Sequence, residues 1–173
     1  SRDVRTIVSS VRDEGDAAVQ AFTRKFDRHD LNETGWRIEK ADWLAAHEAL
    51  APELRAALEL AAERIVAYHL KQKPEDRDEV DAAGARLGAR WRAVDAAGVY
   101  VPGGRAAYPS SVLMNAIPAK VAGVERLVMV TPTPDGEINP LVLAAAQIAG
   151  VDEIWRIGGA QAIAALAYGT GRI

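Results

Sequence analysis

Apolar residues in the first part of the chain recur every three or four positions, a spacing that predicts amphipathic helices. Val4, Ile7 and Val11 share one face of the first helix, and Gly15 is expected to end it. Asp16 then stands where the N-cap of a second helix is expected. The chain is therefore predicted to open with two short helices joined by a tight acidic turn.

Two more helices are predicted before the pattern changes. One begins near Lys40, and a longer one begins at Pro52, since proline is tolerated in a first turn, and ends before Pro74. The charged stretch 74–81 is expected to be a solvated loop. Residues 85–94, in which apolar residues and arginines alternate imperfectly, are typical of a half-exposed strand.

From about residue 97 the chain alternates short apolar strands with helices. The pattern predicts strands at 98–101, 126–130 and 153–157, and helices at 110–122, 139–149 and from Gly159 onward. Short continuous apolar strands separated by helices indicate parallel pairing, right-handed crossovers and helices on both faces of the sheet. We therefore predict an α/β fold. Residues 1–96 form the helix-rich amino-terminal part of a split, incomplete domain, and residues 97–173 form a Rossmann-like βαβαβα parallel sheet, truncated at its carboxyl end.

Composition narrows the class of protein. Apolar residues make up 49% and charged residues 26% of the 173 residues, as in folded globular proteins. The net charge of −3 gives no electrostatic reason to expect nucleic acid or an anionic membrane as a partner. There is no cysteine, which excludes disulfides, thiolate catalysis and cysteine-bound zinc within these residues. The chain begins with Ser1 rather than Met and shows no secretory or membrane-spanning run, so we expect a cytoplasmic protein, cut from a longer one.

Glycine pairs mark two predicted strand ends. Gly103-Gly104 follows the strand at 98–101, and Gly158-Gly159 follows the strand at 153–157. In an open parallel sheet, ligands bind beyond the carboxyl ends of the strands, where glycine permits close backbone approach and helix N-termini favour phosphate. Tyr100 ends one strand and Gln161 lies in the first turn of the following helix, so both are candidate ligand contacts.

Each of these features also has a plain structural explanation. A glycine pair after a strand is more often only a turn, and Ser110 is more often only the N-cap of its helix. The two standard nucleotide-binding fingerprints, G-x-G-x-x-G and G-x-x-x-x-G-K-[ST], are missing. His29, His47 and His69 all fall in the helical first half and are interpreted as exposed or half-buried polar residues rather than metal ligands or catalytic bases. The residue pattern alone predicts only a phosphate-binding α/β domain.

Three longer motifs narrow this further. They are GVYVPGGRAAYPSSVLMNAIPAKVAGV at residues 98–124, GGAQAIAALAYGT at 158–170, and the early pair GDAAV at 15–19 with FTRKFD at 22–27. Together they strongly resemble the histidinol dehydrogenase family, and the similarity covers essentially the whole chain. The resemblance implies an enzyme of histidine biosynthesis that oxidises L-histidinol through L-histidinal to L-histidine, using NAD twice and a zinc ion that holds the substrate.

The resemblance also implies roles for individual residues. Tyr100 and Gln161 match NAD-contacting positions of the family, and the four glycines of the two pairs are expected to shape the same crevice. The family's zinc ligands and catalytic residues match nothing in these 173 residues, so we assign no catalytic or metal-binding residue and expect the chain to be inactive alone. The resemblance implies a homodimer, with L-histidinol as the substrate of the parent enzyme.

Two other functions stay open at this point. A related zinc- and NAD-dependent alcohol dehydrogenase with a different substrate fits the same residues, because the substrate contacts match nothing here. A non-catalytic nucleotide-binding module is the second alternative.

Overall fold

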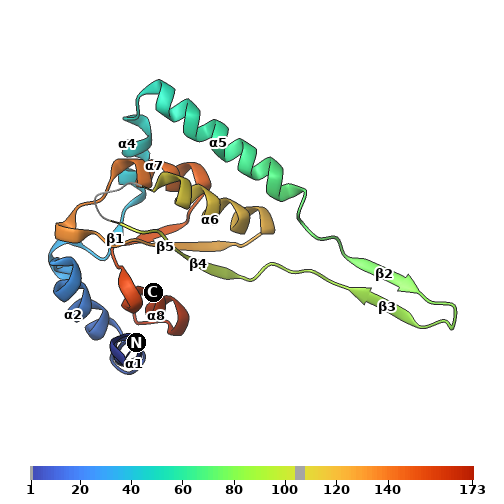
Figure 1. The fold of residues 1–173 in the computed structure, drawn as a ribbon, viewed down its shortest axis with the longest axis horizontal. Coiled ribbons are helices and arrows are strands. Elements are labelled where there is room, and N and C mark those ends of the chain that lie inside the picture. The colour runs from blue at the N-terminus through green and yellow to red at the C-terminus, as the bar shows by residue number, and fades with distance from the viewer. Residues whose placement is uncertain (1, 104–107) are drawn as a thin grey trace.

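The structure is a computed structural model of residues 1–173, and it describes residues 2–103 and 108–173. Gly104, one member of a predicted glycine pair, therefore lies outside the described residues. Figure 1 shows a central sheet with helices above and below it and a thin two-stranded arm that extends away from the body.

The first half is helical, as its periodicity predicts. It contains α1 (Arg2–Glu14), α2 (Asp16–Asp27), α3 (Leu31–Thr34), α4 (Lys40–Glu48) and α5 (Pro52–Leu70), with the short strand β1 (Arg37–Ile38) between α3 and α4. The expected N-cap at Asp16 is wrong by one residue. Gly15 occupies the cap position with φ of 58°, and Asp16 is the first helical residue, where its negative charge favours the helix dipole.

The second half confirms the predicted alternation. It contains β4 (Ala96–Tyr100), α6 (Pro109–Ala122), β5 (Arg126–Val130), the 3-10 turn η1 (Pro134–Gly136), α7 (Pro140–Ala149), β6 (Glu153–Trp155) and α8 (Gly159–Tyr168). The described residues form a sheet with strand order β1-β6-β5-β4, in which β4, β5 and β6 are parallel. Strand β1 pairs antiparallel with β6 at the edge, a feature that the sequence pattern does not reveal.

Helices cover both faces of this sheet, and β5 shows why. Leu127 and Met129 join the core beneath α4, α5, α6 and α7, whereas Val128 and Val130 join the core beneath α1, α2 and α8. Successive side chains of a strand point to opposite faces, so a strand buried on both sides needs apolar residues at every position. Residues before and after position 97 contribute to both cores.

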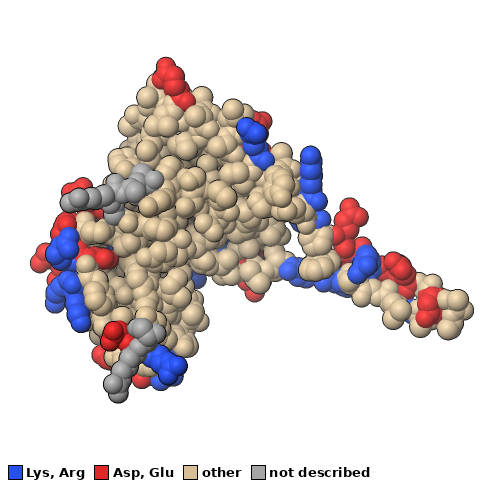
Figure 2. All heavy atoms as spheres, viewed as in Figure 1, with Lys and Arg blue, Asp and Glu red and all other residues tan. Residues whose placement is uncertain are grey.

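The expected loop at 74–81 is wrong. Residues Arg77–Val80 form β2, which pairs antiparallel with β3 (Arg86–Ala89) to make the arm in Figure 1. Arg86 pairs with Asp78 across the two strands, and Figure 2 shows basic and acidic side chains interspersed along the arm. Cross-strand pairing rather than burial of an apolar face holds these residues, which explains why hydrophobic periodicity misses them.

No helix in the described part of the chain is long and apolar enough to cross a membrane.

Candidate functional site

Three strand ends meet at one edge of the sheet because β4, β5 and β6 run in parallel. Strand β4 ends at Tyr100 and continues to Gly103, β5 continues into Pro132, and β6 continues into the Gly158-Gly159 turn. The residues predicted at the ends of β4 and β6 therefore lie at the same edge of the sheet, where ligands of parallel sheets bind.

Tyr100 contacts the opposite turn directly. The backbone N–H of Gly159 donates a hydrogen bond to the Tyr100 hydroxyl, with an N–O distance of 3.2 Å. Since β5 lies between β4 and β6, this bond spans the central strand on the face covered by α8. Tyr100 is half-buried in the core of that face, so its ring is fixed by packing while its hydroxyl reaches the helix N-terminus.

Gln161 points its side chain at the same turn. Only 1% of Gln161 is exposed, and neither its side-chain oxygen nor its nitrogen has a hydrogen-bond partner among the residues that the structure describes. A methyl group added at Gly159 would lie 2.6 Å from Gln161 Oε1, so the amide packs against the turn. Gly159 has φ of 62°, a conformation that glycine adopts without strain. Tyr100 and Gln161 therefore converge on Gly159 from two different elements.

The two glycine turns are held apart by Pro132. A methyl group at Gly103 would lie 2.1 Å from the Pro132 carbonyl oxygen, and one at Gly158 would lie 2.3 Å from Pro132 Cβ. Both distances are far below van der Waals contact, so a larger residue at either position would displace the loop at the end of β5. This requirement for glycine comes from close packing of the three strand ends.

The two helices that begin near this edge, α6 and α8, differ in the residues at their N-termini. Helix α8 begins at Gly159, next to Tyr100 and Gln161, and its first turn presents backbone N–H groups toward the edge. Helix α6 begins at Pro109 with Tyr108 in the N-cap position, so the expected cap at Ser110 is wrong. Of the two helices, α8 carries the features that favour an anionic or polar ligand.

A small hollow lies beside the strand ends. It holds about 20 Å³, and its lining includes Gly103, Thr131, Pro132 and Asn139. The side chain of Asn139 caps α7 by accepting the Leu141 N–H at 2.9 Å, so this helix begins one residue after its predicted start. This hollow has room for about one water molecule, so it is too small to enclose a larger ligand.

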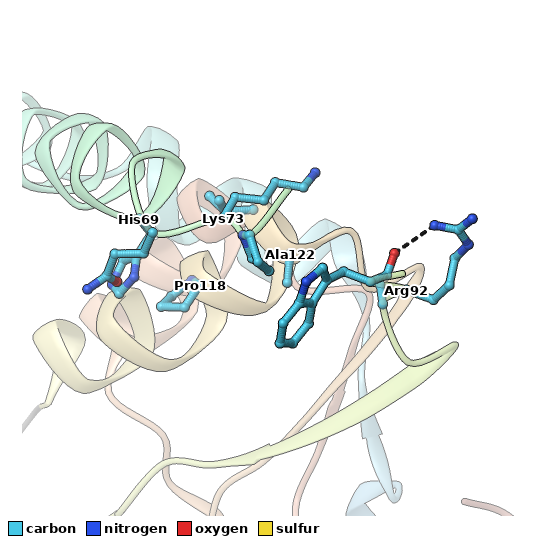
Figure 3. Close-up of a pocket in the computed structure, with 10 residues that line it drawn as sticks. His69, Lys73, Arg92, Pro118 and Ala122 are labelled. Carbon is cyan, nitrogen blue, oxygen red and sulfur yellow. Dashed lines mark hydrogen bonds between the residues drawn. The ribbon is translucent and has the colours of Figure 1, made fainter. Parts of the chain in front are cut away.

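A larger hollow of about 370 Å³ lies away from the strand ends. Figure 3 shows it between the end of α5, the base of the arm and α6, with His69, Pro118 and Ala122 among its lining residues and the Lys73 side chain extending outward. Its position on a different part of the molecule separates it from the predicted site.

The histidines lie elsewhere, and one differs from the expectation. His29 is buried rather than exposed or half-buried, and its Nε2 lies 2.8 Å from the Thr34 hydroxyl. Burial, with a further contribution from the positive charge of Arg156, lowers the pKa of His29. His47 faces Glu59 on α5, and His69 lines the larger hollow. In the described ranges, no three His, Asp or Glu side chains gather as a metal site requires, so these residues do not fit a zinc ion.

Pro132 is the residue of this edge that sequence reasoning missed. It lies two residues after β5, in the run TPTP at residues 131–134, where no glycine pair marks a phosphate-binding turn. A proline just beyond a central buried strand is a signal that could have indicated a rigid strand exit.

The fold and this edge define a parallel α/β protein of the Rossmann-like class, with its candidate site at the carboxyl ends of the strands. The chain belongs to the histidinol dehydrogenase family, because the family model described as "Histidinol dehydrogenase" matches residues 1–173.

Individual relatives agree with this assignment. The chain is 62% identical over 173 residues to the histidinol dehydrogenase of Zymomonas mobilis subsp. mobilis, covering 100% of this chain and 40% of the relative. It is 64% identical over 171 residues to the histidinol dehydrogenase of Ruegeria pomeroyi, covering 98% of this chain and 39% of the relative. The crystal structure of histidinol dehydrogenase from Elizabethkingia anophelis matches with a TM-score of 0.90 and 33% identity, over 99% of this chain and 40% of that one. The chain thus spans about 40% of the length of the relatives it matches.

Proposed function

We propose that this chain is the amino-terminal and NAD-binding segment of a histidinol dehydrogenase that oxidises L-histidinol through L-histidinal to L-histidine. The proposal gives residues 97–173 the cofactor-binding role and residues 1–96 the role of an incomplete first domain. It also includes L-histidinol as substrate, a homodimeric assembly and a cytoplasmic location, which come from the family resemblance.

The buried amide of Gln161 is the observation that carries the NAD proposal. An unpartnered polar group in a protein interior costs about 1–3 kcal/mol, so such groups in native proteins usually meet a partner. Gln161 lies in the first turn of α8, where backbone N–H groups also face outward. A polar ligand that reaches this turn would satisfy the amide and the helix N-terminus together.

The neighbouring residues fit NAD as that ligand. Tyr100 offers a hydroxyl and a ring at the same turn, and Gly103 and Gly158 pack closely against Pro132 and so hold both strand exits at one edge. When bound, NAD supplies the hydride acceptor for oxidation of the alcohol. The residues of this chain hold and orient the cofactor, which is positioning rather than bond-breaking.

Zinc chemistry is assigned to residues outside this chain. The described side chains do not form a zinc site, and we place no proton transfer or metal step on them. We therefore propose that the chain alone does not oxidise L-histidinol.

Steady-state kinetics of the full-length protein tests the proposal. Gln161→Met replaces the amide with an apolar side chain of similar length and is expected to raise KM for NAD about tenfold or more, the effect of losing one good polar contact. Gln147→Met is the matched control, because Gln147 is exposed on α7. An unchanged KM for NAD in Gln161→Met would remove the basis of the proposal.

A further inference from the structure

Pro132 lies between the two turns that the proposed function assigns to NAD. Its carbonyl oxygen faces Gly103 at the exit of β4, and its ring faces Gly158 at the exit of β6. The neighbouring backbone is fixed on both sides. The Thr131 N–H donates to the Trp155 carbonyl at 3.1 Å, and the Val101 N–H donates to the Val130 carbonyl at 3.0 Å. The loop at the end of β5 is therefore bonded to both neighbouring strand exits.

We propose that Pro132 is a positioning residue for the cofactor: its ring sets the separation between the Gly103 and Gly158-Gly159 turns. This inference rests on the proposed function of the same edge. The N–H of Gly159 and the amide of Gln161 follow directly on the turn that Pro132 contacts, so the position of Pro132 determines where both groups lie relative to Tyr100.

Proline suits this position for two physical reasons. Its pyrrolidine ring fixes φ near −65°, so the strand exit cannot relax when the neighbouring turns move. Its compact ring packs directly on the Cα of Gly158, where a methyl group would lie 2.3 Å from Pro132 Cβ and 2.9 Å from Cγ. Close packing of this kind transmits a displacement of one turn to the other.

The two glycines provide a built-in comparison. The contact at Gly158 is with ring atoms, which glycine at position 132 would remove, leaving Pro132 Cα at 3.0 Å as the nearest remaining atom. The shortest contact at Gly103 is with the backbone carbonyl oxygen at 2.1 Å, which every residue at position 132 retains, and the ring follows with Cγ at 2.9 Å. A positioning role of the ring therefore predicts stronger coupling of position 132 to position 158 than to position 103.

The experiment is a double-mutant cycle in the full-length protein, with KM for NAD and kcat as readouts. Gly158→Ala is expected to raise KM for NAD about tenfold or more in the wild-type background, and about threefold or less when Pro132→Gly is also present. Gly103→Ala is expected to keep most of its effect when Pro132→Gly is also present, because the contact with the carbonyl oxygen remains. Pro134→Gly, two residues along the chain, serves as the control and is expected to leave KM for NAD unchanged.

The single variant Pro132→Gly tests the role of the ring even if an alanine variant fails to fold. It adds no atom and therefore creates no steric clash. We expect it to raise KM for NAD about fivefold or more with kcat changed less than about twofold. Faster hydrogen exchange of the Gly159 amide is expected alongside, because that amide bonds to Tyr100.

The outcomes separate this inference from the function on which it rests. Equal effects of Gly158→Ala in both backgrounds, or an unchanged KM for NAD in Pro132→Gly, would overturn the positioning role while leaving the proposed function intact. If Gln161→Met and Tyr100→Phe also leave KM for NAD unchanged, the NAD proposal itself fails.

Discussion

The hydroxyl of Tyr100 accepts a hydrogen bond from the backbone N–H of Gly159, 59 positions further along the chain. This bond joins the end of β4 to the start of α8 across the intervening strand β5. It uses one of the N–H groups that the first turn of a helix leaves without an intrahelical partner. The same bond therefore stabilises the fold and fixes a residue of the candidate cofactor site.

Removing this hydroxyl should destabilise the chain measurably. Tyr100→Phe keeps the ring and its packing but leaves the Gly159 N–H without its acceptor, so we expect a loss of about 1 kcal/mol in the free energy of unfolding. Urea titration followed by circular dichroism measures the loss. Tyr68→Phe is the control, because Tyr68 is exposed on α5. Equal unfolding midpoints for Tyr100→Phe and the wild type would contradict the role of the bond.

Gln161→Met should act in the opposite direction on stability. The buried amide has no partner in the described part of the chain, so an apolar side chain of similar volume removes a desolvation cost. We expect the free energy of unfolding of the 173-residue chain to rise by about 1 kcal/mol. If the variant is more stable but binds NAD more weakly, the native glutamine serves ligand binding at a cost in stability.

Thermal unfolding of the 173-residue chain tests this gain, with Gln147→Met on the exposed face of α7 as its control. A loss of stability in Gln161→Met would show that the amide has a structural partner.

Hydrophobic periodicity predicts most of this fold, because burial of one or both faces determines most of its elements. The alternation from β4 to α8 follows directly from apolar runs such as Arg126–Val130, four of whose five residues are buried. The arm follows a different rule. Its strands Arg77–Val80 and Arg86–Ala89 are almost entirely exposed, and they depend on cross-strand pairing and on Gly88, whose missing side chain leaves room for the Arg77 carbonyl oxygen.

The candidate site is predicted only in part for a similar reason. The rule that ligands bind beyond the carboxyl ends of parallel strands places Tyr100, Gly103 and Gln161 at one edge from the sequence. Their convergence on Gly159 depends on the strand order and on the path of each turn, which sequence periodicity does not contain. The role of Pro132 depends on two close approaches from distant parts of the chain, so it emerges only from the structure.

The 173-residue chain by itself should bind NAD in the millimolar range or undetectably. We place the remaining cofactor contacts outside this chain, and each lost polar contact contributes about 1.5–3 kcal/mol, where every 1.4 kcal/mol is about tenfold in affinity. Isothermal titration of the chain against NAD measures this directly, with the full-length protein as the comparison. Micromolar affinity of the 173-residue chain would show that these residues suffice for cofactor binding.

Asp152 lies just before β6 and bonds to both β5 and α6, so its ionisation should make the stability of the fold depend on pH. Its Oδ2 accepts the Leu127 N–H at 2.7 Å and contacts Lys120 Nζ at 2.5 Å, which joins the start of β5 to α6. Burial acts to raise the pKa of Asp152, but the hydrogen bonds and the charge of Lys120 together outweigh burial and lower it. A carboxyl whose folded pKa lies below its unfolded value stabilises the fold when ionised.

The sign of the effect follows from this shift. The contribution of Asp152 is fully present above its ordinary pKa of 3.8 and is lost as the pH falls through the lower folded value. Asp152→Asn should therefore lower the free energy of unfolding by about 1 kcal/mol near neutral pH, a modest figure because the side chain is partly exposed. The difference from wild type should shrink as the pH falls below 3.8.

Urea titrations of both proteins at several pH values measure this, with Glu63→Gln on the exposed face of α5 as the control. A difference that stays constant from neutral to acid pH would mean that the ionised carboxylate is not what stabilises this junction.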